Sequence, residues 1–328
     1  MKTVDLFGFD PYFIFVILYN NYTVIPEDAY KKGSVVTIGN FDGLHKGHRT
    51  ILEKGMNLAR LNKMEFTVCT FEPHPVELFL KERPRLRLLT PESKYKIMAE
   101  LGVSSVLAQH FDSGFASIEP EDFVKHVLVD GLNAKIVVVG SDFRFGKDRK
   151  GNIEVLKNEG QKYGFDVIGE ELLLDEEIAV SSSRIRDLIL RGEITAANSL
   201  LLRYHEVDGV VVHGQKHGRT MGFPTLNLES SELLLPKDGI YAAFTVLDDK
   251  RVLRSAVYIG LRPTLEFGRS FEVFLLHFDE EIYNKSVTVR FVERIRGDMK
   301  FKDESALQSQ IRLDVEKIEN ILECHDEY

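Results

Sequence analysis

The strongest constraint on the fold is a repeated alternation of short apolar runs with amphipathic segments between residues 34 and 191. The runs are rich in valine and mostly uninterrupted by polar residues, which is typical of strands buried on both faces of a sheet. Because helix-like segments separate them, the pattern predicts a doubly wound parallel α/β sheet. The predicted strands are residues 34–39, 66–71, 105–108 and 135–140, and the predicted helices are residues 47–62, 91–101, 119–129 and 152–163.

The pattern changes after Arg203, where short strand-like segments alternate with Gly, Pro and Asp. This spacing predicts an antiparallel β-barrel or sandwich, preceded by one or two helices at residues 181–202 and followed by an amphipathic helix at residues 304–323. A chain of 328 residues favours two domains. We predict a first domain at residues 1–202, whose residues 1–33 form a leader without an assigned role, and a second at 203–328.

Composition narrows the possible partners. The formal net charge of -9 gives no support for a nucleic-acid-binding protein. The two cysteines, Cys69 and Cys324, form no zinc-ligand pattern and favour a cytoplasmic location.

The apolar residues 11–19 are too few to span a membrane, which takes about 20 residues, so we expect a buried strand or a packed leader there. The expected partners are small-molecule substrates, without nucleic acid or membrane, and a homo-oligomer stays open.

The most informative segment is GNFDGLHKGH at residues 39–48, between a predicted strand and a predicted helix. Gly47 lets a phosphate approach the backbone, and a helix N-terminus offers free N–H groups to an anion. His45 and His48 can donate hydrogen bonds to the charge that develops on a departing pyrophosphate. The alternative is a pair of surface histidines at a helix start. The candidate phosphate-binding residues of this turn are Gly39, Asn40, Asp42 and Gly47.

Further polar groups follow the other predicted strands, at the edge where parallel sheets bind ligands. They lie in FEPHP at residues 71–75 and GSDFRFG at residues 140–146. Asp142 could bind a ribose or a hydrated magnesium ion, and Phe143 or Phe145 could line an apolar ring pocket, although ordinary core packing would explain both rings. Ser182 and Ser183 lie at the start of a predicted helix, where their hydroxyls could hold a phosphate or only cap the helix. Arg186 could bind phosphates through paired N–H groups of its guanidinium.

In this order the four motifs GNFDGLHKGH, FEPHP, GSDFRFG and VSSSRIR resemble the FMN adenylyltransferase module of bacterial bifunctional FAD synthetases. The resemblance covers about residues 34–191 and includes the HxGH signature of the nucleotidyltransferase superfamily. It implies that His45 and His48 bind the ATP phosphates and assist the departure of pyrophosphate. It also implies that the serines and Arg186 contact the nucleotide. Ser183 stands where threonine is usual and keeps the hydroxyl.

The second constellation is GVVVHGQKHGRTMGFPTLNL at residues 209–228. Its glycine-rich loop could wrap phosphates through Gly218 and Gly222, with basic side chains beside them. Thr225 and Asn227 are two apart on a predicted strand, so they point to the same side and could hold magnesium through hard oxygen ligands. A turn or an ordinary strand hydrogen bond is the alternative for this pair.

The remainder of the chain resembles the riboflavin kinase module. The phosphate-loop pattern is carried by Gly214, Gly218, Arg219 and Gly222, followed by Thr225 and Asn227. The resemblance implies that Arg262 and Thr264 flank the substrates, that Glu272 is the catalytic base, and that Arg296 lies on the flavin side. The sequence departs from the family pattern at Tyr258, Phe274, His277 and Asn284, where asparagine, histidine, aspartate and glycine are usual, and at Asp298, where glutamate is usual.

Together the two resemblances imply an enzyme that uses ATP and Mg²⁺ to convert riboflavin to FMN and then FMN to FAD. A monofunctional FMN adenylyltransferase with a weakened kinase domain is the first alternative. A flavin-binding regulator without catalysis would need broken phosphate motifs, whereas these are intact. An HxGH transferase acting on a pantetheine or a pyridine mononucleotide would have no use for the second domain.

Overall fold

The computed structural model describes residues 2–4, 16–79, 86–213, 222–230, 233–261 and 269–325. Contacts divide the chain into two compact units, the first ending at Ser181 and the second running from Ser182 and including residues 86–88. This division precedes the predicted domain boundary because helices α7 (Ser182–Arg191) and α8 (Ile194–Leu201) belong to the second unit, where α8 packs on strands of the barrel. The boundary at residues 202/203 stays a prediction.

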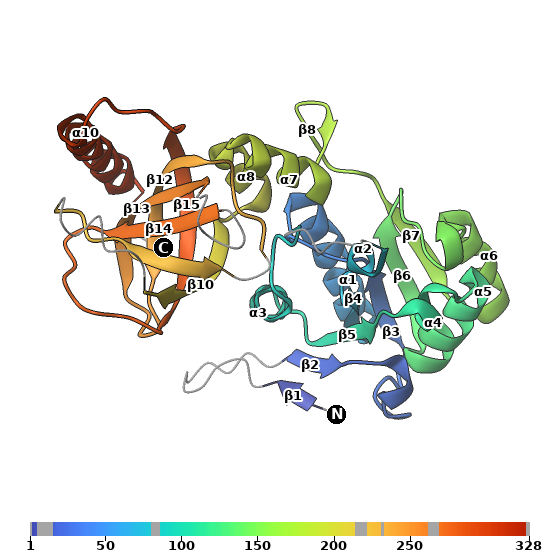
Figure 1. The fold of residues 1–328 in the computed structure, drawn as a ribbon. Coiled ribbons are helices and arrows are strands. Elements are labelled where there is room, and N and C mark those ends of the chain that lie inside the picture. Colours follow the sequence, from blue (N-terminus) through green and yellow to red (C-terminus); the bar gives the residue numbers. More distant parts are fainter. Residues whose placement is uncertain are drawn as a thin grey trace. The chain divides into compact units, whose positions relative to one another are not determined.

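The first unit is built on a seven-stranded sheet in the order β1-β2-β5-β4-β3-β6-β7 (Figure 1). All neighbouring strands are parallel except β1 and β2, which confirms the predicted parallel sheet. The strands are β1 (Lys2–Val4), β2 (Val16–Tyr19), β3 (Ser34–Ile38), β4 (Glu65–Glu72), β5 (Ser105–His110), β6 (Ala134–Gly140) and β7 (Asp166–Glu170), and β8 (Leu174–Asp175) and β9 (Ile178–Ala179) form a separate hairpin.

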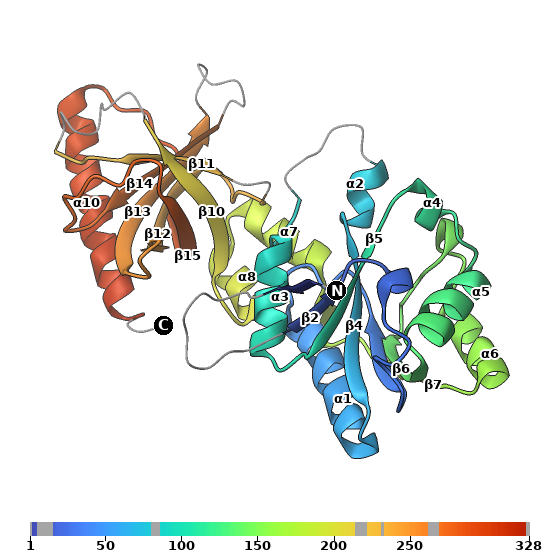
Figure 2. The ribbon, with the colours of Figure 1, turned by 90° about the horizontal axis from the view of Figure 1, so that it is seen from below.

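Helices cover both faces of this sheet, as Figure 2 shows for α1 on one side and α5 and α6 on the other. Successive side chains of β3 enter different cores: Val35 packs with α1 and α3, and Val36 packs with α5, η2 and α6. Burial on both faces explains why the strand sequences are uninterrupted apolar runs. The helices are η1 (Tyr22–Val24), α1 (Lys46–Asn62), α2 (Pro75–Phe79), α3 (Pro91–Glu100), α4 (Ser113–Ala116), α5 (Pro120–Phe123), η2 (Val124–Gly131), η3 (Lys147–Arg149) and α6 (Ile153–Tyr163).

Two sequence expectations change in detail. The apolar stretch at residues 11–19 is a strand over Val16–Tyr19, paired with β5 and β1, and its residues 11–15 lie outside the described residues. The helix predicted at residues 119–129 divides into α5 and the π-helical segment η2, which extends to Gly131. Within the described part of the chain, no helix combines the length and apolar character needed to cross a bilayer.

The second unit contains a closed antiparallel barrel in the order β10-β11-β14-β13-β12-β15, which confirms the predicted barrel. Its interior is filled by aromatic and branched side chains; Tyr241 and Phe291 meet edge to face at 5.4 Å between ring centroids, and both are 0% exposed. The strands are β10 (His205–Val212), β11 (Leu226–Ser230), β12 (Gly239–Val246), β13 (Val252–Leu261), β14 (Arg269–Leu275) and β15 (Ser286–Arg296).

Helix α10 (Glu304–Glu323) covers part of the outer surface of the barrel and spans the residues predicted for it. Asp303 caps its N-terminus by accepting a hydrogen bond from the backbone N–H of Ala306 at 2.8 Å. Ile318 and Leu322 pack on Ala242 and Val292, so the apolar stripe of the helix buries the outward side of two strands.

A buried histidine makes the second unit sensitive to acid. Burial lowers the pKa of His205 from 6.5 to about 4, and its Nε2 lies 2.8 Å from the carbonyl oxygen of Leu234. Between about pH 6.5 and pH 4 the unfolded chain binds a proton at this position that the folded chain does not. Folding stability therefore falls as the pH decreases through this range.

We predict that the free energy of unfolding drops by about 2 kcal/mol between pH 7 and pH 5 from this group alone. His205→Gln should remove that part of the pH dependence, measured by chemical denaturation followed by circular dichroism at both pH values. His277→Gln is the matched control, because the His277 side chain is 84% exposed. An unchanged pH dependence in His205→Gln would contradict the prediction.

Candidate functional site

The turn between β3 and α1 has an unusual backbone. Gly43 has a φ of 84°, and the non-glycine residues Phe41 and Leu44 have φ values of 51° and 41°, in the left-handed region. The side chains of Phe41 and Leu44 are 2% and 0% exposed and pack in the core beneath the turn. Their burial holds a backbone conformation that these residues would otherwise avoid.

His45 is the N-cap of α1. Its Nδ1 accepts a hydrogen bond from the backbone N–H of His48 at 3.3 Å, so the proton of the neutral ring lies on Nε2. The two imidazole rings are stacked, with centroids 3.7 Å apart and planes 17° apart. The two predicted histidines are therefore brought together at a helix N-terminus, where the helix dipole favours an anion.

Gly47 lies in the first turn of α1 with an ordinary helical conformation. A Cβ at this position would come no closer than 3.4 Å to the His45 ring and 3.6 Å to the carbonyl oxygen of Val180. The protein itself therefore has room for a small side chain here. A requirement for glycine would come from whatever approaches the turn.

Asp142 and Phe143 follow β6 at the same edge of the sheet. A Cβ on Gly140 would lie 3.0 Å from an Asp142 side-chain oxygen and 3.9 Å from Ile51 of α1, so the end of β6 lies against the helix that carries His48. Phe145 is only 6% exposed and stacks on the half-buried Phe143 at 5.5 Å between centroids. Phe145 thus packs in the core, and Phe143 is the better placed of the two rings to meet a ligand.

An ion pair that the sequence analysis missed lies beneath this edge. Lys94 of α3 and Glu72 at the end of β4 are 2.6 Å apart, with side chains 6% and 17% exposed. The sequence does hold a signal, because Lys94 shares a helical face with the apolar residues Met98 and Leu101. A lysine on a buried stripe needs a partner, and the partner here belongs to the FEPHP motif.

Ser182, Ser183 and Arg186 belong to α7, in the second unit. Ser182 is the first residue of the helix and Ser183 is exposed. The Nε of Arg186 donates to the carbonyl oxygen of Leu86 at 2.7 Å.

The second constellation comes together on the outer face of the barrel. In the strand register, Asn227 of β11 and Tyr258 of β13 both lie opposite Glu272 of β14. The Thr225 hydroxyl donates to one Glu272 oxygen at 3.2 Å, and the Ser270 hydroxyl donates to the other at 2.8 Å. The predicted Thr225, Asn227 and Glu272 thus form one oxygen-rich patch, and Ser270, two residues from Glu272 on the same side of the strand, was missed.

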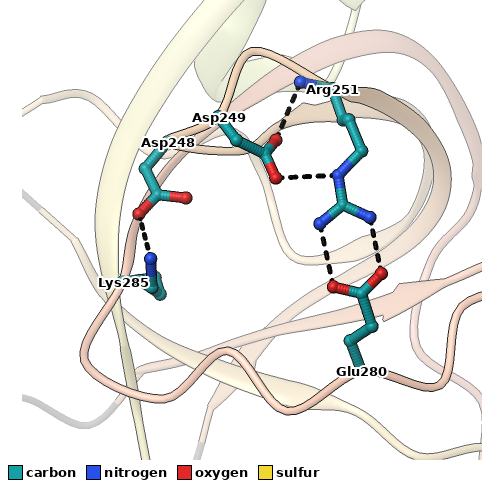
Figure 3. Close-up of polar contacts among 5 residues, drawn as sticks. All are labelled: Asp248, Asp249, Arg251, Glu280 and Lys285. Carbon is teal, nitrogen blue, oxygen red and sulfur yellow. Dashed lines mark hydrogen bonds and ion pairs between the residues drawn. The ribbon is translucent and has the colours of Figure 1, made fainter.

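A cavity of about 210 Å³ adjoins this patch, lined by residues 224–226, Leu275 and residues 278–283. A charged cluster fixes one wall: Arg251 makes a two-pronged contact with Glu280, at 2.6 and 2.8 Å, and a third hydrogen bond with Asp249 (Figure 3). These hydrogen bonds hold the pKa of the Glu280 carboxyl below its usual value. A hollow of about 530 Å³ along α10 is larger, but its lining includes none of the residues predicted for either site.

Several predicted residues lie outside the described residues: Gly214, Gly218, Arg219, Arg262 and Thr264. Gly222 is described and has a φ of 84°, a conformation that favours glycine.

Arg296 is tied to a helix. Its guanidinium contacts the Asp314 carboxylate of α10 at 2.7 to 3.1 Å, with side chains 18% and 7% exposed. Such a pair joins the end of β15 to α10, and a contact with a ligand would have to share the guanidinium with Asp314.

Among the described residues, neither a cysteine nucleophile nor a metal centre of His, Cys, Asp or Glu ligands finds support. Burial raises the pKa of the Cys69 thiol to about 12, which makes it a poor nucleophile. Among the residues that the structure describes, no group of three or more His, Cys, Asp or Glu side chains could hold a metal ion.

Comparison with protein families gives two matches that together span most of the chain. A family model described as FAD synthetase matches residues 27–184, and one described as riboflavin kinase matches residues 201–322. His45 and His48 fall inside the first match and Glu272 inside the second, while Arg186 lies between the two.

Similar whole proteins are known. The chain is 35% identical over 289 residues to a bifunctional riboflavin kinase/FMN adenylyltransferase of Escherichia coli, covering 88% of this chain and 92% of that protein. It is 32% identical to the protein of the same name from Bacillus subtilis, covering 89% and 92%. A crystal structure described as a macrolide-efflux protein from Streptococcus pneumoniae matches with a TM-score of 0.83 and 32% identity, over 93% of this chain and 99% of that one.

We predict that Asp314→Ala lowers the free energy of unfolding by about 3 kcal/mol, because it leaves the Arg296 charge largely buried without its partner. Thermal and chemical unfolding followed by circular dichroism would measure the change. Asp187→Ala is the control, since the Asp187–Arg191 pair is exposed and its loss should cost under about 1 kcal/mol. Equal effects of the two substitutions would show that the Arg296–Asp314 pair does not hold α10 to the barrel.

Proposed function

The chain belongs to the family of bifunctional riboflavin kinase/FMN adenylyltransferases, and from this premise we propose how its residues divide the work. The enzyme phosphorylates riboflavin to FMN and adenylylates FMN to FAD. The monofunctional alternative is not favoured, because the riboflavin kinase match covers residues 201–322. The single observation that carries the proposal is the stacked His45–His48 pair at the N-terminus of α1.

In the adenylyl transfer, an FMN phosphate oxygen attacks the α-phosphorus of ATP, and the bond from that phosphorus to the bridging oxygen of the β-phosphate breaks. The leaving group is pyrophosphate, which gains negative charge as it departs. His45 would donate from Nε2 and His48 from its ring to these oxygens, and the N–H groups of α1 would add to the stabilisation. The room at Gly47 supports a close phosphate.

The remaining ligand contacts of this site are proposals from the motif match. Gly39, Asn40 and Asp42 would shape the phosphate side of the turn, and Ser182, Ser183 and Arg186 would meet the nucleotide. Asp142 would bind a hydroxyl group or a hydrated cation. Phe143 would face the flavin ring, supported by Phe145 behind it.

In the kinase reaction, the riboflavin 5′-hydroxyl oxygen bonds to the γ-phosphorus of ATP while Glu272 accepts the hydroxyl proton. The bond from that phosphorus to the bridging oxygen of the β-phosphate breaks, and ADP leaves. Hydrogen bonds from Thr225 and Ser270 support this role, because each fixes one carboxylate oxygen. Each oxygen has two lone pairs, so both retain acceptor capacity for the substrate proton.

We propose that Mg²⁺ binds with ATP at Thr225 and Asn227. The donor set fits this ion, since the side chains present hard oxygen atoms beside one carboxylate. So few protein ligands suit an ion that keeps several waters and takes the rest of its coordination from phosphates. When bound, the ion offsets negative charge on the transferring phosphoryl group.

The cavity beside Thr225 is our candidate for the base of this ATP. Leu226, Ile282 and the Tyr283 ring provide apolar surface there, and Tyr283 stacks on His213 with centroids 4.0 Å apart. By the motif match, Gly214, Gly218, Arg219 and Gly222 would surround the phosphates, and Arg262 and Thr264 would flank the substrates. Arg296 would act on the flavin side through its end of β15.

We also propose that the enzyme works in the cytoplasm on small molecules, without nucleic acid. The support is chemical: both cysteines are free and the chain carries a net charge of -9.

Exchanging one residue at each site tests the division of labour. We predict that His48→Ala lowers FAD formation from FMN by at least about 100-fold and leaves FMN formation from riboflavin unchanged. Glu272→Ala should do the reverse. Products would be separated by chromatography after supplying riboflavin or FMN alone. Loss of both activities in one folded variant would contradict independent sites.

Ser270 offers a finer test of the proposed base. Removing a hydrogen bond to a charged group costs about 1.5–3 kcal/mol, so Ser270→Ala should lower kcat for FMN formation by about 10-fold or more, with FAD formation unchanged. Ser255→Ala is the matched control, because this serine is buried between strands β12 and β13 and bonds Thr245. Wild-type kcat in folded Ser270→Ala would show that Ser270 does not orient Glu272.

A further inference from the structure

A buried lysine lies directly beneath the turn that carries His45 and His48. The Lys94 ammonium lies 2.6 Å from Glu72, 3.3 Å from the Thr70 hydroxyl and 3.5 Å from the carbonyl oxygen of Asn40. These three oxygens match the three N–H donors of an ammonium. A charge this well enclosed is retained only where its partners are in place.

Lys94 and Thr70 both donate a hydrogen bond to one backbone atom. The Asn40 carbonyl oxygen accepts from Lys94 and also from the Thr70 hydroxyl, at 3.1 Å. Thr70 and Glu72 are alternate residues of β4, and Lys94 comes from α3. Side chains of β4 and α3 thus hold the first peptide group of the turn.

The turn needs such a hold because of its backbone. Immediately after Asn40, Phe41 adopts a left-handed φ of 51°, and Leu44 does so again at 41° just before His45. Such conformations persist in non-glycine residues only when the surroundings determine them fully. Core packing fixes the two side chains, and the Asn40 carbonyl is where polar contacts fix the main chain.

We propose that Lys94 is a positioning residue for FMN adenylyl transfer. Its ammonium, neutralised by Glu72, holds the Asn40 carbonyl and thereby sets where His45 and His48 lie relative to the ATP phosphates. The inference relies on the proposed role of the two histidines. It assigns Lys94 no contact with substrate.

The chain provides its own control for folding, since the kinase reaction belongs to the barrel unit and the Lys94 cluster to the other. The informative variants are Lys94→Met and the double variant Lys94→Met/Glu72→Gln, in which neither charge remains buried without a partner. Lys162→Met is the matched control, because the Lys162 side chain is 56% exposed while its partner Glu159, at 13%, is about as buried as Glu72 at 17%.

For both variants at Lys94 we expect kcat for FAD formation to fall by about 10- to 100-fold, the range for a small misplacement of catalytic groups. The KM values for FMN and ATP should change far less, and FMN formation by the same preparations should stay at the wild-type rate. Neutralising Glu72 should restore the unfolding temperature toward wild type without restoring kcat. Lys162→Met should leave both activities unchanged.

A purely structural role predicts the opposite pattern. A folded double variant that makes FAD with wild-type kcat would overturn the proposal, and so would a loss of FAD formation that merely follows the unfolded fraction. His48→Ala separates the premise from the inference: if that variant keeps FAD formation, the role of the histidines fails. If only the Lys94 variants keep it, the positioning role alone fails.

Discussion

The proposed adenylyl-transfer site depends on one strained connection, the passage of the chain from β3 into α1. The backbone must turn sharply at the carboxyl edge of the sheet and deliver His45 as the cap of the helix. Packing of Phe41 and Leu44 and the hydrogen bonds to Asn40 make this conformation the stable one. The result is a rigid array of donors at a helix N-terminus, which suits charge stabilisation better than flexible side chains would.

In the barrel, strand alternation and register position the proposed kinase residues, where the first unit uses a turn. Alternation along β14 sends Phe271 and Val273 into the barrel interior and places Ser270 and Glu272 together on the other side of the strand. Antiparallel register then brings Asn227 and Tyr258 to Glu272 from the two neighbouring strands. Tyr258, where the family usually has asparagine, therefore stands directly beside the proposed base. Because the His45–His48 pair and the Glu272 cluster lie in different units, the two reactions need not share these groups.

The elements that the sequence predicted correctly are those whose formation depends mainly on residues close together in the chain. Residues 34–39 and 135–140 were recognisable as strands because both faces are buried, and α10 was recognisable from its apolar stripe and the capping Asp303. Strand β7 escaped notice, since it is short and only partly buried. The histidine pair was predicted from the motif, whereas the capping role of His45 follows from the conformation of the turn before α1. Arg296 was assigned to the flavin by resemblance, and its ion pair with Asp314 depends on how α10 folds back on the barrel.

Lys94 and Glu72 meet only after α3 packs on β4. The sequence alone could therefore show that Lys94 lies on an apolar helical face, but not that Glu72 is its partner.

The central claim is that two separate sites in one chain each capture the phosphates of ATP for a different flavin. The most direct measurement supplies the wild-type enzyme with ATP and either riboflavin or FMN, with magnesium or with a chelator, and follows FMN, FAD and pyrophosphate. The account predicts FMN from riboflavin, FAD with stoichiometric pyrophosphate from FMN, and loss of both when magnesium is removed. Absence of magnesium-dependent ATP turnover with either flavin would contradict it.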